Sequence, residues 1–256
     1  MVSGDDASFD QMDYHEEFMR TQGIASGYAQ MFNDELDGIV NLFKAGDALV
    51  TATYPRVSFL DPLVVEVKTP ERAHRYLIEE YLPGNYTKYN SNMGYVEKEC
   101  VMLTGGDGVQ NNLFFVDELE AIEEGSEGSE SDEEGEVNVS EVLFNSEANV
   151  RPLGTRFNLD QVEDSYIPQV FSHFTYERSR KRLMVVDLQG TLTTSGDGTK
   201  LYKFTDPVIH KHRKRQTFRK MKFGRTDRGE KGMRAFFETH VCTELCRLLG
   251  LHPIGS

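Results

Sequence analysis

The 256-residue chain has no tryptophan, only three cysteines and no run of 18 apolar residues. Because it lacks such a run, no membrane span is expected. Its N-terminus also lacks the basic and then apolar pattern of a secretory signal. Three cysteines, an odd number, argue against a disulfide scaffold and fit a reducing compartment. These absences favour a cytoplasmic protein whose length allows one large domain or two lobes.

Basic side chains are missing from residues 117–136, which carry eleven acidic ones. Without this segment the formal net charge of −14 would be −3, so the acidity is local. A composition rich in glutamate, glycine and serine cannot bury enough apolar area to offset chain entropy. We therefore expect a disordered acidic insert over residues 117–141.

Apolar periodicity and turn residues predict a chain of the α+β class. The expected elements are a helix over residues 16–33, short strands within 50–67, a strand over 75–82, a strand pair at 171–176 and 183–189, a hairpin within 191–204 and a last helix over 230–249. The sequence Gly-Asp-Gly at 196–198 is the turn signal of the hairpin.

One imidazole and two thiols lie within seven residues near the C-terminus, at His240, Cys242 and Cys246. Tetrahedral zinc takes four nitrogen or sulfur ligands, so a fourth must come from elsewhere. In an ideal helix His240 and Cys246 are nearly two turns apart, so a helix end or local unwinding is needed near Cys242. A core histidine with two buried cysteines explains the segment equally well.

Six further motifs precede this segment in order. They are Q-x-x-A-x-x-Y-A-x-x-F-N at 22–33, EEYLPG at 79–84 with KYN at 88–90, VFSHFTYE at 170–177, LMVVDLQG at 183–190, FTDP at 204–207 and FGRTDRGEKG at 223–232. Together they resemble the alpha-kinase family, atypical protein kinases of the myosin-heavy-chain-kinase, elongation-factor-2-kinase and channel-kinase type. The resemblance covers most of residues 13–96 and 166–252.

The resemblance implies a two-lobed atypical protein-kinase-like fold, with a partial N-lobe at 1–83 and a C-lobe at 84–256. It implies a serine/threonine kinase that uses Mg-ATP to phosphorylate a protein. Asp187 would orient or deprotonate the substrate hydroxyl, and Gln189 and Asp206 would bind magnesium. Because Asp187 and Gln189 alternate along a predicted strand, both should project to one face. Glu79 would be the hinge acceptor, with Leu82 under the adenine.

The resemblance also implies a substrate loop containing Gly224, Gly229 and Gly232, and a fourth zinc ligand at His173 on the strand beside Asp187. The implied ligands are His173, His240, Cys242 and Cys246. Such a closed site is structural and staples the C-lobe, and it leaves no exchangeable water for a metal-dependent hydrolase. His210 is a weaker competitor for the fourth place, and Cys100 is not expected to be a ligand.

The family's ATP-phosphate lysine lies on a strand before the 22–33 helix, but no lysine precedes Lys44. A truncated N-lobe is therefore expected, and a pseudokinase acting as a zinc-stabilised interaction module is the alternative. Nine basic residues between Lys211 and Arg228 could hold an acidic or phosphorylated peptide or dock the acidic insert. Few aromatic residues lie among them, so no nucleic-acid partner is expected.

Overall fold

The computed structural model describes residues 6–45, 54–96, 163–212 and 223–252. The acidic insert predicted at 117–141 lies outside these ranges, as does Cys100. The elements are α1 (Asp6–Ala45), β1 (Arg56–Phe59), β2 (Leu63–Lys68), β3 (Ala73–Ile78), β4 (Thr87–Lys88), η2 (Asp164–Tyr166), α4 (Ile167–Arg178), β5 (Leu183–Val186), β6 (Gln189–Thr194), β7 (Lys200–Thr205), β8 (Val208–Lys211), α5 (Gly229–Thr239) and α6 (Glu244–Leu248). This mixture confirms the α+β class.

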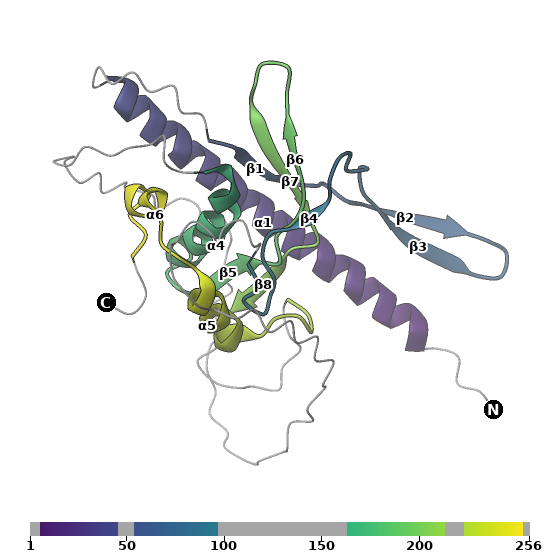
Figure 1. Ribbon diagram of the computed structural model, residues 1–256. Coiled ribbons are helices and arrows are strands. Elements are labelled where there is room, and N and C mark those ends of the chain that lie inside the picture. The colour runs from purple at the N-terminus through teal and green to yellow at the C-terminus, as the bar shows by residue number, and fades with distance from the viewer. Residues whose placement is uncertain (1–5, 46–53, 97–162, 213–222, 253–256) are drawn as a thin grey trace, which may run out of the picture.

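The described strands form three small sheets (Figure 1). The largest has the order β1-β7-β6-β4, in which β1 runs parallel to β7 and the other neighbours are antiparallel. Strands β5 and β8 form an antiparallel pair, as do β2 and β3. The predicted hairpin within 191–204 is confirmed as β6–β7, with Gly198 at a positive φ of 84° in its turn.

Helix α1 runs along the molecule and supplies much of the core (Figure 1). Ala25, Ala29 and Phe32 are buried at the spacing of one helix face. Phe32 meets the rings of Phe171 and Phe174 of α4, with centroids 5.5 and 5.2 Å away. At the end of this stretch Asn33 exchanges two 2.9 Å hydrogen bonds with the backbone of Val57, which fixes β1 against the helix.

The prediction of a strand at 171–176 is wrong, because these residues lie in the helix α4. All nine residues from Ile167 to Thr175 are buried, so this stretch of the helix has no face exposed to solvent. A segment buried on every side shows no helical period, and its aromatic and β-branched residues then resemble a buried strand. Pro168 stands in the first turn, a position that suits a helix start.

The prediction of a single last helix over 230–249 is also wrong, because an extended segment at 240–243 separates α5 from α6. His240 leaves the helical conformation with φ −73° and ψ 127°. This break is the local unwinding that the spacing of His240 and Cys246 demands.

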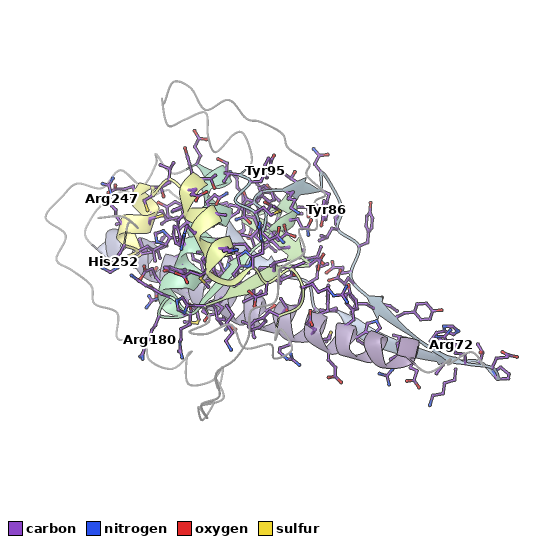
Figure 2. The ribbon with its side chains drawn as sticks, turned by 90° about the horizontal axis from the view of Figure 1, so that it is seen from below. Arg72, Tyr86, Tyr95, Arg180, Arg247 and His252 are labelled. Carbon is purple, nitrogen blue, oxygen red and sulfur yellow. The ribbon has the colours of Figure 1, made fainter. Side chains whose placement is uncertain are left out.

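The β2–β3 hairpin extends away from the main body, and Arg72 marks its far end (Figure 2). Leu63, Tyr76 and Ile78 of this hairpin are exposed. Strand β3 ends at Ile78, earlier than the predicted end at 82. Among the described residues, no helix combines the length and the apolar character that crossing a membrane requires.

Candidate active site and metal cluster

Asp187 occupies a bend between β5 and β6 rather than a strand position. Its φ of 60° lies in the left-handed region, which costs a non-glycine residue about 1–3 kcal/mol. The expectation that Asp187 and Gln189 alternate along one strand is therefore wrong. The bend nevertheless brings them together, because Gln189 Nε2 donates to Asp187 Oδ2 at 3.4 Å.

The bend is held by the segment that follows the predicted hinge. The buried Asn90 side chain accepts a hydrogen bond from the Leu188 amide at 3.0 Å and donates to Ser172 Oγ of α4 at 3.0 Å. The amide of Tyr89 donates to the Leu188 carbonyl at 2.9 Å. Both backbone polar groups of Leu188 are thus satisfied where the chain leaves regular structure.

Lys88 has a role here that the sequence did not reveal. Its Nζ lies 2.7 Å from Asp187 Oδ1, and strand pairing places Lys88 directly opposite Gln189. The ion pair fixes the direction of the Asp187 carboxylate. The sequence did not reveal this pairing, because nothing near Lys88 points to a partner so far along the chain.

Asp206 joins the same cluster from the end of β7, also with a left-handed backbone (φ 48°). Its backbone carbonyl accepts from Gln189 Nε2 at 3.5 Å. Burial, and next the charge of Asp187, raise the pKa of Asp206, while Lys88 opposes this rise. Two carboxylates that repel each other suit a hydrated magnesium ion, which would relieve the repulsion.

Glu79 follows β3, and its carboxylate contacts the end of β7. Both of its carboxylate oxygens lie 2.7 Å from the donating Thr205 hydroxyl, and Gln22 Nε2 of α1 donates to Oε1 at 3.3 Å. Glu79 thus contacts Thr205, the last residue of β7, and Asp206 is the next residue of the chain. Leu82 is half-buried between β3 and β4.

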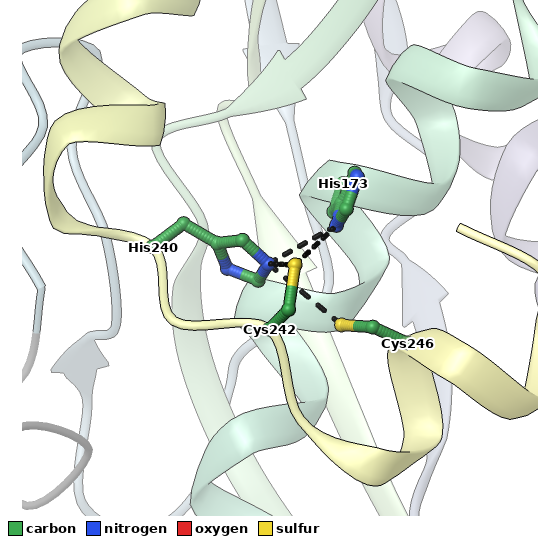
Figure 3. A group of neighbouring side chains, drawn as sticks. All are labelled: His173, His240, Cys242 and Cys246. Carbon is green, nitrogen blue, oxygen red and sulfur yellow. Dashed lines mark hydrogen bonds between the residues drawn. The ribbon is translucent and has the colours of Figure 1, made fainter. Parts of the chain in front are cut away.

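Four potential metal ligands converge beside the middle of α4 (Figure 3). Their ligand atoms, from His173, His240, Cys242 and Cys246, all lie within 4.8 Å of one another. His240 Nε2 lies 3.1 Å from His173 Nδ1, 3.6 Å from Cys242 Sγ and 3.7 Å from Cys246 Sγ. A zinc tetrahedron with usual bond lengths has edges of about 3.3–3.8 Å. The donor set and its spacing therefore fit zinc.

The surroundings of His173 prepare it for this role, although it comes from a helix and not from the predicted strand. Its Nε2 donates to the carbonyl of His252 at 3.1 Å, which leaves Nδ1 to face the cluster. Burial, with a contribution from His240, lowers the pKa of His173 to about 4 and keeps the ring neutral. Hydrogen bonds from Cys246 and His240 lower the pKa of Cys242 to about 4, whereas the pKa of Cys246 is raised by its bond to Cys242 and by burial.

His210, the competitor for the fourth place, is fully buried and bonded elsewhere. Its Nε2 donates to the Asn92 carbonyl at 3.1 Å and its Nδ1 accepts from the Arg228 amide at 3.1 Å.

The three glycines of the predicted substrate loop do not lie in one continuous loop. Gly224 lies in a turn, Gly229 begins α5 and Gly232 lies within α5, where a Cβ would collide with the His210 ring. The prediction of Gly232 as a loop residue is wrong, since it serves close packing.

Comparison with known proteins identifies the family. A sequence model of the family described as alpha-kinase matches residues 2–105 and 135–246. The chain therefore belongs to the alpha-kinase family. The interval between the two matched ranges contains most of the acidic segment.

Two similar proteins are alpha-protein kinase vwkA of Dictyostelium discoideum and eukaryotic elongation factor 2 kinase of Rattus norvegicus. The first is 25% identical over 235 residues, which are 92% of this chain and 24% of that protein. The second is 27% identical over 198 residues, which are 77% of this chain and 17% of that protein. This chain thus spans less than a quarter of the length of either relative.

A solved structure, the alpha-kinase domain of myosin heavy chain kinase A in complex with ADP, has a TM-score of 0.50 and 23% identity. The match covers 94% of this chain and 59% of that one. The likeness shows that the fold is that of an alpha-kinase domain.

The buried His210 predicts how stability changes with pH. Burial lowers its pKa below the ordinary value of 6.5, an effect that the hydrogen bond to Asn92 and then the charge of Asp227 partly offset. Between the two pKa values the unfolded chain binds a proton that the folded chain does not, so the free energy of unfolding falls as pH drops below about 6.5. Urea unfolding should show a larger loss between pH 7 and pH 5 for the native chain than for His210→Asn. Parallel losses in both proteins would contradict this.

Proposed function

We propose that the chain is an atypical protein kinase that transfers the γ-phosphate of Mg-ATP to serine or threonine of a protein. The observation that carries the proposal is the convergence of Asp187, Gln189 and Asp206 at the ends of β5 and β7, with Lys88 on Asp187. Phosphoryl transfer requires positioned charge more than covalent help from the protein, and this cluster supplies it.

Each residue has a role that its contacts allow. Asp187 accepts or orients the proton of the substrate hydroxyl, and the ion pair with Lys88 holds its carboxylate in direction. The amide nitrogen of Gln189 faces Asp187 and the Asp206 carbonyl, and we assign this side chain, with the Asp206 carboxylate, to the magnesium site. Magnesium held there would neutralise charge on the phosphates. Glu79 and Leu82 contribute the hinge that binds adenine.

The proposed metal in the His173 cluster is zinc with a structural role. Four protein ligands close the coordination sphere, so the ion would join α4 to the segment that leads into α6. Its binding energy would add to the folding energy of this part of the chain.

We further propose an N-lobe at 1–83, a C-lobe at 84–256 and a cytoplasmic location, with ATP and a protein substrate as partners and no nucleic acid. A second candidate function is that of a pseudokinase, a zinc-stabilised interaction module. The metal cluster favours it, because four protein ligands fit a structural ion whether or not the chain transfers phosphate.

Transfer of radiolabelled phosphate from ATP separates the two candidates. We expect the native chain to label itself or a threonine-containing peptide mixture in the presence of magnesium. Asp187→Asn should lower the rate by about 100-fold or more, because the proton acceptor is removed. The exposed Glu71→Gln in the β2–β3 turn is the matched control and should retain the native rate.

Equal labelling by the native chain and Asp187→Asn would contradict the kinase proposal. An inactive native chain whose melting temperature does not respond to Mg-ATP, but which contains zinc, would support the interaction module.

Metal analysis tests the zinc proposal. The native chain should hold about one zinc per chain, and Cys246→Ser should lose the metal and melt at a lower temperature, since a missing ligand leaves a buried cluster unpaired. Cys100→Ser is the matched control and should keep both metal and stability. A metal-free native chain that is fully folded, or zinc loss in the Cys100 variant alone, would overturn the assignment.

A further inference from the structure

The turn at 224–228, which leads into α5, is built on two buried polar side chains. One is Asp227, whose side chain is fully buried. Its Oδ1 accepts from the Gly229 amide at 2.8 Å and from the Lys211 amide at 3.0 Å. A single carboxylate oxygen thus fastens the first residue of α5 to the last residue of β8.

The other is His210, which joins three segments. Its Nδ1 accepts from the Arg228 amide and its Nε2 donates to the Asn92 carbonyl, so the ring is neutral with its proton on Nε2. Gly232 lets α5 approach this ring, because a Cβ there would collide with it. Gly94, in the turn that follows Asn92, meets the backbone of Ala235 in the same helix.

The turn at 224–228 and the acid pair, Asp187 and Asp206, both lie near the N-terminal part of α1. Glu17 of α1 lies directly over Gly224, where a Cβ would collide with its carboxylate. One turn earlier in α1, the pKa of Tyr14 is raised by burial and next by the charges of Asp206 and Glu79. The same stretch of α1 therefore borders both the turn at Gly224 and the carboxylates of the candidate active site.

Along the chain, β8 makes the same connection. Asp206 immediately precedes the residue before β8, and His210 lies within that strand. Strand pairing places His210 opposite Met184 of β5, the strand that leads into Asp187. Arg225, Thr226 and Arg228 of this turn are exposed to solvent, whereas its backbone is held by the buried side chains of Asp227 and His210.

We infer that His210 is a positioning residue for the protein substrate. Its Nδ1 bond to the Arg228 amide sets the position of the turn at 224–228, and that turn receives the polypeptide segment carrying the acceptor hydroxyl. This inference rests on the proposed kinase function. His210 lies outside both the metal cluster and the acid pair. The inferred role is that it controls the binding of the peptide but not the binding of ATP.

Two substitutions separate the two bonds of the ring. In His210→Asn the side-chain oxygen takes the place of Nδ1 and still accepts from the Arg228 amide. In His210→Gln the side-chain nitrogen takes the place of Nε2 and still donates to Asn92, but the Arg228 amide loses its acceptor. The exposed His212→Gln, two residues further on, is the matched control.

The first measurement is steady-state phosphorylation of one threonine-containing peptide, selected with the native chain from a random mixture. We expect His210→Gln to raise the KM for peptide by about tenfold, the effect of one lost hydrogen bond with an orphaned donor, and to leave kcat and the KM for ATP within about twofold. His210→Asn should keep the native KM for peptide, and so should His212→Gln.

The second measurement is amide hydrogen exchange at Arg228, which needs no activity. The amide should be protected in the native chain and in His210→Asn, and should exchange faster in His210→Gln. An unchanged peptide KM in His210→Gln, or equal losses in kcat and both KM values for the two variants, would overturn the inference.

A native chain that transfers no phosphate would end the kinase proposal and the substrate role with it. Protection at Arg228 would still report separately on the bond.

Discussion

The bridge made by Asn90 is the contact on which both candidate sites depend. This buried side chain binds Ser172 of α4 on one side and the amide of Leu188 on the other. It therefore fixes the left-handed bend at Asp187 against the most buried helix of the described chain. His173, the next residue of α4, faces the metal cluster. Two neighbouring residues of one helix thus support the acid pair and the ligand cluster.

This arrangement explains why a structural ion would matter to a site that it does not touch. An ion held by His173 and the C-terminal thiols would immobilise α4. A fixed α4 in turn gives Asn90 a rigid partner, and the strained backbone at Asp187 persists only where its surroundings hold it. The charge balance of the acid pair is then local: Lys88 pairs with the Asp187 carboxylate, while burial and then repulsion by Asp187 raise the pKa of Asp206.

Sequence reasoning succeeded where the chemistry is local. The spacing of His240, Cys242 and Cys246 required a helix break, and the Gly-Asp-Gly turn predicted a hairpin, both of which the structure contains. It failed where distant residues decide. Residues 171–176 resembled a strand because α4 is buried on all sides and therefore shows no period. The bend at Asp187 is imposed by Asn90, which stands 98 residues before Leu188, so no local pattern could reveal it.

The most direct test of the account is calorimetric titration of the chain with ADP, with and without magnesium. The acid pair and the Gln189 side chain are proposed to form a cation site beside a nucleotide, so magnesium should tighten ADP binding in the native chain. In Asp206→Asn that dependence on magnesium should largely disappear. Binding of equal strength with and without magnesium in the native chain, or no binding at all, would contradict the account.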